Sequence, residues 1–122
     1  MSWTGEELKA IESAKGLYVA PFREDGKTYG TNTWVWSVTV DSELYVRAYH
    51  GLKSRWYQGA LRQQAGRATI GDTVYEVSYT PPDDVLTSAI DAAYRAKYSG
   101  SSYLGAMVSA GAQAATMRIS RR

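Results

Sequence analysis

A group of cations without a nearby carboxylate is the feature of this sequence best suited to chemistry. Between Leu44 and Gly71 the chain has five lysines and arginines, no aspartate or glutamate, and its single histidine, His50. Guanidinium groups beside aromatic rings suit an anionic ligand, such as a phosphate, a carboxylate or an enolate-like group. The cations are Arg47, Lys53, Arg55, Arg62 and Arg67, and the aromatic residues among them are Tyr45, Tyr49, Trp56 and Tyr57.

Arg47 is the cation of this group that most needs a partner. It lies in the middle of a strand predicted for residues 44–49, and a buried guanidinium without a counter-charge is costly. Because no acid lies nearby in the sequence, its partner must be Glu76, Asp91 or a bound ligand. An ion pair would make Arg47 structural, whereas an open aromatic cleft would make it a ligand clamp. The sequence favours the clamp.

A second candidate group lies on a helix predicted in the last third of the chain. Tyr94 and Lys97 are three residues apart, so their side chains can touch along one side of the helix. A lysine beside a phenol lowers the pKa of the phenol and makes it a better proton donor. The alternative, which this weak pattern favours, is an amphipathic helix with tyrosines packed over the sheet. His50 is either a base or proton donor near neutral pH or an ordinary loop residue. His50, Tyr94 and Lys97 are therefore the candidate catalytic residues.

The composition excludes several kinds of chemistry. The absence of cysteine and the single histidine exclude disulfides, thiolate chemistry and multi-histidine metal sites, so we expect no metal. The formal charge of +2 does not favour a nucleic acid as the partner. No stretch approaches the roughly 18 apolar residues of a membrane helix. With no hydrophobic signal core either, we expect no membrane association and a cytoplasmic location. The glycines form no phosphate loop or dinucleotide fingerprint.

Hydrophobic periodicity and turn residues predict short strands interspersed with helices. The 122 residues are enough for one domain, residues 1–122. Strands are predicted over residues 17–20, 31–40, 44–49, 67–70, 73–80 and 115–120. Helices are predicted over residues 4–16, 54–66 and 84–98, with a short helix or ordered loop over 99–115. Because neighbouring strands form hairpins, these elements predict an α+β fold with a small antiparallel sheet or barrel.

The aromatic residues are weighted toward types that favour pockets and interfaces. The chain has ten tyrosines, four tryptophans and one phenylalanine, and tyrosine and tryptophan join a large apolar body to a polar group. Trp34 and Trp36 lie two apart on one predicted strand, so they share a face unless a bulge intervenes. We expect one of them to be buried and the other to lie at a ligand or dimer surface.

The sequence resembles an uncharacterised bacterial family of domains of unknown function, and the likeness covers nearly the whole chain. Four segments carry it: 44–47 (Leu-Tyr-Val-Arg), 55–57 (Arg-Trp-Tyr), 91–98 (Asp-Ala-Ala-Tyr-Arg-Ala-Lys-Tyr) and 114–118 (Ala-Ala-Thr-Met-Arg). The segment 91–98 is the most specific of the four. No activity follows from this resemblance.

Residues 22–70 are also distantly similar to the deazaflavin-dependent nitroreductase branch of the flavin-reductase-like split barrels. The likeness lies in a turn with Gly and Thr, a Trp-bearing strand, a second strand and a Trp-Tyr pair opening a helix. It implies a split-barrel-like sheet of about six strands flanked by three or four helices. It also implies FMN or a deazaflavin as cofactor, and usually a homodimer. The implied cofactor-binding residues are Lys27, Tyr29, Thr31, Arg47, Lys53, Trp56 and Tyr57, with Asn32 beside them.

This resemblance has a departure that bears on the cofactor. The Lys-Ser-Gly phosphate turn of the superfamily is replaced here by Glu24-Asp25-Gly26-Lys27, in which two carboxylates would repel a phosphate. Three functions therefore stay open. The first is a flavin- or deazaflavin-binding domain, as in an oxidoreductase acting on a small molecule. The second is a cofactor-free acid–base enzyme (an isomerase, cyclase or lyase) for a small anionic or aromatic metabolite. The third is a non-catalytic dimeric ligand-binding domain.

Overall fold

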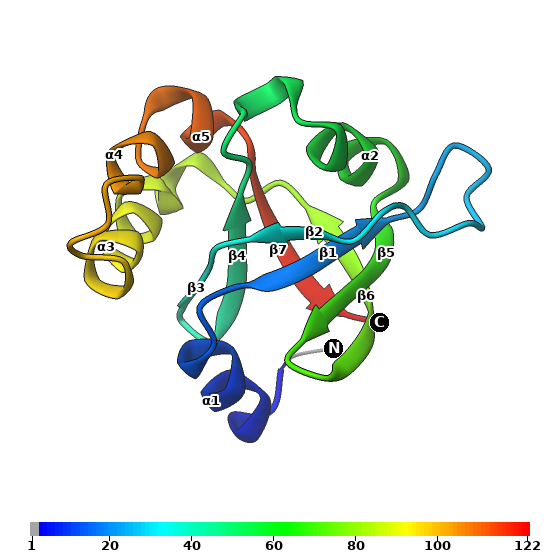
Figure 1. The fold of residues 1–122 in the computed structure, drawn as a ribbon, viewed down its shortest axis with the longest axis horizontal. Helices are drawn as coiled ribbons and strands as arrows, with labels where there is room; N and C mark the ends of the chain where they lie inside the picture. The colour runs from blue at the N-terminus through cyan, green and yellow to red at the C-terminus, as the bar shows by residue number, and fades with distance from the viewer. Residues whose placement is uncertain (1–2) are drawn as a thin grey trace.

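The chain folds around a seven-stranded, wholly antiparallel sheet that curls into a nearly closed barrel (Figure 1). The computed structural model describes residues 3–122. The strands follow the spatial order β2-β1-β5-β6-β7-β4-β3. Their bounds are β1 Leu17–Pro21, β2 Thr33–Val35, β3 Ser37–Val40, β4 Glu43–Arg47, β5 Ala65–Ile70, β6 Thr73–Thr80 and β7 Thr116–Arg121.

A single residue, Trp36, links the two edge strands of the sheet and so brings the barrel close to closure. β2 pairs with β1 at one margin of the sheet, and β3 pairs with β4 at the other, yet only Trp36 separates β2 from β3 in the chain. The stretch predicted as one strand over residues 31–40 is therefore two short strands that serve opposite margins. A single strand cannot pair with both, so the backbone leaves the ladder at Trp36.

Two apolar clusters hold the fold together. The larger fills the barrel, and inward-facing residues of β4 and β7, among them Leu44, Val46 and Met117, are fully buried in it. Trp3 is buried in the same cluster and donates a hydrogen bond from Nε1 to the Ile119 carbonyl at 2.9 Å. Burying large apolar side chains in this way is the main stabilising term of such a domain.

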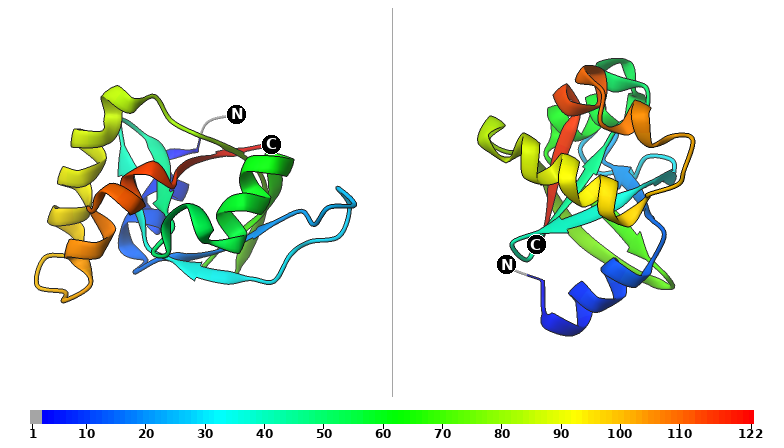
Figure 2. Two further views of the ribbon diagram at one scale, coloured as in Figure 1. Left: turned by 90° about the horizontal axis from the view of Figure 1, so that it is seen from above. Right: turned by 90° about the vertical axis from the view of Figure 1, so that its left-hand side faces the viewer.

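The smaller cluster lies outside the barrel, between its wall and the helices of the C-terminal half. Helix α3 (Thr87–Lys97) packs across β3, with Ile90 and Tyr94 against Val38 and Tyr45 (Figure 2). Both faces of β4 are thus covered, which is why its two alternating sets of side chains are buried. The remaining helices are α1 Gly5–Ser13, α2 Arg55–Gln63, α4 Leu104–Met107 and α5 Ala110–Ala114, with single 3₁₀ turns η1 Gly51–Lys53 and η2 Asp84–Leu86.

The predicted α+β class and antiparallel barrel-like sheet are confirmed. The sheet has seven strands where about six were expected, because the 31–40 stretch divides at Trp36. The capping box at the first helix is present, with Thr4 and Glu7 each accepting a backbone hydrogen bond from the other residue. Both hairpins form, as β3–β4 and β5–β6. Within residues 3–122, no helix is both long and apolar enough to cross a membrane.

Gly66 marks the tightest contact between strands, and its replacement by alanine is expected to destabilise the domain. A Cβ at this position would lie 2.5 Å from the Ala20 carbonyl oxygen and 2.6 Å from the Pro21 Cα. Because both contacts are with backbone, β1 and β5 would have to separate, at a cost of about 1–3 kcal/mol in the free energy of unfolding. Chemical denaturation measures this loss. Gly105→Ala is the matched control, since a Cβ there meets no atom within 4 Å and should leave stability nearly unchanged.

Candidate functional site

A cleft opens where the barrel leaves its ladder at Trp36, between the end of β4 and the start of α2. It has a volume of about 820 Å³, within the range typical of small-molecule sites. We call it the aromatic pocket. It is lined by Thr33, Trp34, Val35, Trp36, Arg47, Tyr49, His50, Lys53, Ser54, Arg55, Trp56, Tyr103 and Met107.

Three tryptophans give this pocket its apolar walls. Trp34 keeps half of its surface exposed, and its ring rests on Gly16, where a Cβ would come within 2.9 Å of the indole. Trp36 stacks on Tyr98 with ring centroids 3.9 Å apart, and it packs against the smaller apolar cluster outside the barrel. The expected division into one buried and one surface tryptophan is met only in part, because Trp36 is half-buried and both tryptophans line the pocket. The break between β2 and β3 takes the place of the bulge considered in the sequence.

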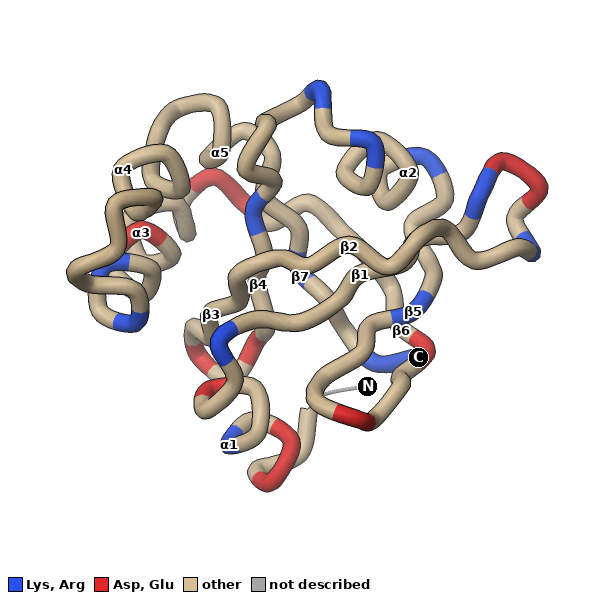
Figure 3. The backbone as a smooth tube through the Cα atoms, in the orientation of Figure 1, with Lys and Arg blue, Asp and Glu red and all other residues tan. Residues whose placement is uncertain are grey.

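The pocket also carries positive charge. Lys53 and Arg55 are exposed there, and among the described lining residues none is an aspartate or glutamate. Lysines and arginines recur along η1 and α2 in the tube drawing (Figure 3). Because α2 begins at Arg55, the end of the helix that favours anions also borders the cleft. The pocket can therefore hold a planar group by stacking and an anionic group by ion pairing.

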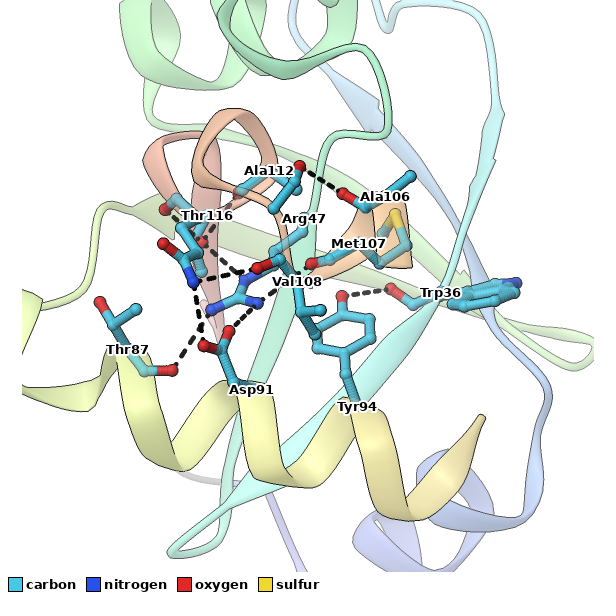
Figure 4. Close-up of polar contacts among 12 residues, drawn as sticks. Trp36, Arg47, Thr87, Asp91, Tyr94, Ala106, Met107, Val108, Ala112 and Thr116 are labelled. Atoms are coloured by element: carbon cyan, nitrogen blue, oxygen red, sulfur yellow. Dashed lines mark hydrogen bonds and ion pairs between the residues drawn. The ribbon is translucent and has the colours of Figure 1, made fainter. Parts of the chain in front are cut away.

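Arg47 lies beneath the pocket and is held by the protein itself (Figure 4). Its side chain has no exposed surface, and Nη1 forms a charged hydrogen bond with Asp91 on α3. Nη1 also donates to the Met107 carbonyl and Nε to the Thr116 hydroxyl, both at 3.1 Å, while Nη2 donates to the Thr87 carbonyl at 3.4 Å. One guanidinium thus joins β4, β7, α3 and α4.

These contacts correspond to the structural alternative for Arg47 rather than to the ligand clamp that the sequence favoured. A clamp needs outer nitrogens that face an open cleft, whereas those of Arg47 point toward α3 and α4. Asp91 was one of the two acids considered as partner, and its second oxygen accepts a hydrogen bond from Gln113 at 2.9 Å. The sequence does not show that the segment before β7 folds back against α3, where Gln113 contacts Asp91.

Tyr94 and Lys97 form hydrogen bonds with backbone carbonyls at the break in the sheet between β2 and β3. The Tyr94 hydroxyl donates to the Trp36 carbonyl at 3.2 Å, and Lys97 Nζ donates to the Ser37 carbonyl at 2.7 Å. The Tyr98 hydroxyl accepts from the Ser37 amide at 3.0 Å. Buried peptide groups outside a ladder need such partners. The three side chains thus compensate for hydrogen bonds that the sheet lacks where it changes partner, and none of them lines the aromatic pocket.

The structure agrees with the favoured alternative for this helix, because Tyr94 packs over the sheet and Lys97 does not lower its pKa. Tyr94 is completely buried, and burial raises the pKa of its phenol far above the usual value, although the nearby Arg47 guanidinium acts in the opposite direction. Burial lowers the pKa of Lys97, whose ammonium lies instead among carbonyl oxygens. A phenol that resists ionisation and lies outside the pocket is poorly placed to donate a proton to a substrate.

The stability of the domain is expected to fall as the pH rises above about 10. Burial raises the pKa values of Tyr79 and Tyr94 in the folded state, whereas tyrosines of the unfolded chain lose their protons near pH 10. Above that pH the unfolded state binds fewer protons, so the stabilisation is complete below about pH 10 and is lost as the pH rises further. Thermal melts between about pH 8 and pH 11 measure the loss.

The control for this pH effect is a pair of phenylalanine variants. The double variant Tyr79→Phe, Tyr94→Phe should lose part of the alkaline slope, because it lacks the two phenols with the most strongly raised pKa values. Tyr103→Phe should keep the whole slope, since Tyr103 is exposed. An unchanged slope in the double variant would contradict the assignment.

The other predicted site residues divide between the pocket and its surroundings. His50 and Lys53 line the pocket. The His50 ring packs edge-on against the Tyr49 ring, with the ring centroids 5.2 Å apart. Trp56 also lines the pocket, although most of its side chain is buried. Tyr57 points away from it, toward the core and the Ala114 carbonyl.

The loop 22–32 does not bring Lys27, Tyr29 and Thr31 to the aromatic pocket. This loop projects beside α2 (Figure 1), and Lys27 is exposed on it. The Tyr29 hydroxyl hydrogen-bonds to Glu76 on β6, and the Arg67 guanidinium lies 3.6 Å from the Tyr29 ring centroid. Tyr29 therefore fastens the loop to the β5–β6 hairpin. Thr31 borders a second, adjoining cleft.

Several pocket residues were missed by motif reasoning from the sequence. Tyr103 and Met107 come from the Ser-, Gly- and Ala-rich segment after α3, which carries no motif, and Tyr103 packs edge-on near Tyr49 at 6.1 Å. For Trp34 and Trp36, the expectation was only that one of the two would lie at a ligand or dimer surface. The one available signal was the surplus of tyrosine and tryptophan over phenylalanine.

The chain belongs to a family of uncharacterized proteins conserved in bacteria (DUF2255), which it matches over residues 7–119. This agrees with the resemblance to an uncharacterised bacterial family carried by segments such as 91–98. No curated protein matches the sequence.

Proposed function

We propose that this domain binds a planar, anionic heterocycle of the flavin or deazaflavin class in the aromatic pocket, as the cofactor of an oxidoreductase for a small molecule. The observation that carries the proposal is the lining of the pocket. Three tryptophans line it together with Lys53 and Arg55, with no carboxylate among the described lining residues. Such a set fits a flavin, which has a large ring system for stacking and anionic groups for pairing.

Each part of the pocket has a role in this proposal. The open face of Trp34 would stack on the ring system, with Trp56 at its edge. Lys53 and Arg55 would pair with the anionic part of the ligand, aided by the first turn of α2. A bound flavin or deazaflavin supplies hydride transfer, and His50 at the pocket wall would hold or move a proton on the substrate side. The cytoplasm is the compartment we propose for this reaction.

The test is a titration of purified protein with FMN, followed by the visible absorbance and fluorescence of the flavin. We expect saturable binding with a dissociation constant in the micromolar range, about −8 kcal/mol. Lys53→Gln should weaken binding several-fold, whereas the matched control Lys9→Gln on the exposed face of α1 should not. Unchanged spectra with both FMN and a deazaflavin at millimolar concentration would exclude the proposal.

We also propose that two copies of the chain associate over the mouth of this pocket. Tyr49 and Tyr103 are half exposed or more beside it, and so is Leu52 on η1. Exposed aromatic residues clustered around one opening are typical of interfaces. Light scattering should give twice the mass of the 13.5 kDa chain. A monomer at high micromolar concentration would contradict this assembly.

A further inference from the structure

A separate cleft lies where α1 and α3 both pack against β3 (Figure 1). It has a volume of about 320 Å³, which is at the lower end of the range typical of small-molecule sites. We call it the α1–α3 pocket. It is lined by Glu12, Val38, Thr39, Ala93, Ala96 and Lys97. None of these residues lines the aromatic pocket, so the two cavities are distinct.

Lys97 contributes a positive charge to this pocket that has no counter-charge. Its half-buried Nζ donates to the Ser37 carbonyl at 2.7 Å and to the Ile11 carbonyl at 3.2 Å. An ammonium group has three donors, and the acceptor left for the third is the Ser37 hydroxyl at 3.5 Å, a distance too long for a strong bond. Within residues 3–122 no carboxylate lies within 4 Å of Nζ. Burial lowers the pKa of Lys97, so an anionic partner would stabilise its charged form.

Glu12 contributes the opposite charge to the same pocket. It is exposed near the end of α1, and its Oε1 accepts a hydrogen bond from the Thr39 hydroxyl at 3.1 Å. Its charge acts to raise the pKa of Lys97, yet the two groups form no ion pair in the described part of the chain. The pocket therefore presents a carboxylate and an ammonium that are not joined to each other. Such a pair is complementary to a ligand that carries both charges itself.

The rest of the lining is apolar and small. Val38 is buried in the smaller apolar cluster. Ala93 and Ala96 are three residues apart on α3, so they lie on the same side of the helix. Three short aliphatic side chains leave room for an aliphatic group of a ligand and favour its burial. The pocket thus combines two opposite charges with an apolar surface.

We infer that the α1–α3 pocket binds a free aliphatic α-amino acid, whose carboxylate pairs with Lys97 and whose ammonium pairs with Glu12. The aliphatic side chain of the ligand lies against Val38 and the two alanines of α3. This site is independent of the proposed flavin site, because the two pockets share no residue. A bound amino acid bridges α1 and α3 across β3, and so it stabilises the folded chain by mass action.

The experiment compares L-leucine with two analogues that keep its side chain and lose one charge each. Isoamylamine lacks the carboxylate, and 4-methylpentanoate lacks the ammonium. Calorimetric titration of the purified chain should show leucine binding with a dissociation constant below about 1 mM. Each analogue should bind about 10-fold or more weakly, because each lacks one charged hydrogen-bonding partner. The melting temperature should rise with leucine concentration and much less with either analogue.

Two variants test the two charges of the pocket separately. Glu12→Gln keeps the size of the side chain and should weaken leucine binding about 10-fold, while changing the affinity for 4-methylpentanoate little. Glu6→Gln is the matched control, since Glu6 is exposed on the same helix and does not line the pocket. Lys97→Met should abolish leucine binding. Because Lys97 also bonds to backbone carbonyls, a melting curve first verifies that this variant folds, and if it does not, Glu12→Gln and the analogues decide.

Three results would overturn the amino-acid site. The first is the absence of any heat or thermal shift with leucine up to about 10 mM. The second is equal affinity for leucine and 4-methylpentanoate, which would reduce the pocket to a site for anions. The third is a Glu12→Gln variant that binds leucine as the wild type does. None of these results bears on FMN, whose titration tests the aromatic pocket separately.

Discussion

Replacing Asp91 with alanine is expected to lower the free energy of unfolding by about 3–5 kcal/mol. The substitution would leave the Arg47 guanidinium charged and unpaired, in a site where its side chain has no exposed surface. A domain of this size has a total stability of about 5–15 kcal/mol, so the loss is a large part of it. The melting temperature should fall by about 10 °C or more.

A second variant distinguishes loss of the ion pair from loss of packing. In the double variant Arg47→Met, Asp91→Leu both charges are absent, so most of the stability should return even though three polar contacts of Arg47 are gone. Asp84→Ala is the control for the single change, because Asp84 is exposed on η2. If Asp91→Ala melts within about 2 °C of the wild type, the pair does not hold α3 to the barrel.

The elements of the fold that depend on local sequence were predicted well. The capping box around Thr4, the hairpin that became β5–β6 and the apolar stripe of α3 each depend on residues close in the chain. The missed feature was the division of the 31–40 stretch at Trp36. Which margin of the sheet each half joins depends on β1 and β4, so it is a non-local choice that alternation cannot reveal.

The same limit applies to the acid–base alternative that the sequence left open for Tyr94 and Lys97. Their spacing on α3 was visible, but their partners lie some sixty residues earlier, at the carbonyls of Trp36 and Ser37. Nothing near them in sequence shows that these two carbonyls face α3. Arg47 is a similar case, because Asp91 is 44 residues away. The positive half of the pocket, by contrast, was visible as the run of cations from Lys53 onward.

Replacing Trp34 with alanine is expected to weaken FMN binding by about 10- to 100-fold, because stacking on one aromatic side chain is worth about 1–3 kcal/mol. The ring is half exposed, with one side toward Gly16 and its edge near Tyr18. Its loss should therefore cost about 1 kcal/mol or less of stability. Fluorescence titration measures the affinity, and melting curves measure the stability.

The proposed dimer makes Trp34→Ala informative in a second way. If the exposed indole serves mainly to bury surface against another copy, the variant should fall to monomer mass in light scattering and keep its FMN affinity. If it stacks on the ligand, affinity falls and mass does not change. Leu61→Ala is the matched control, because Leu61 is exposed to a similar degree on α2 and lines neither pocket. A Trp34→Ala variant with wild-type FMN affinity would remove the stacking role from the proposed flavin site.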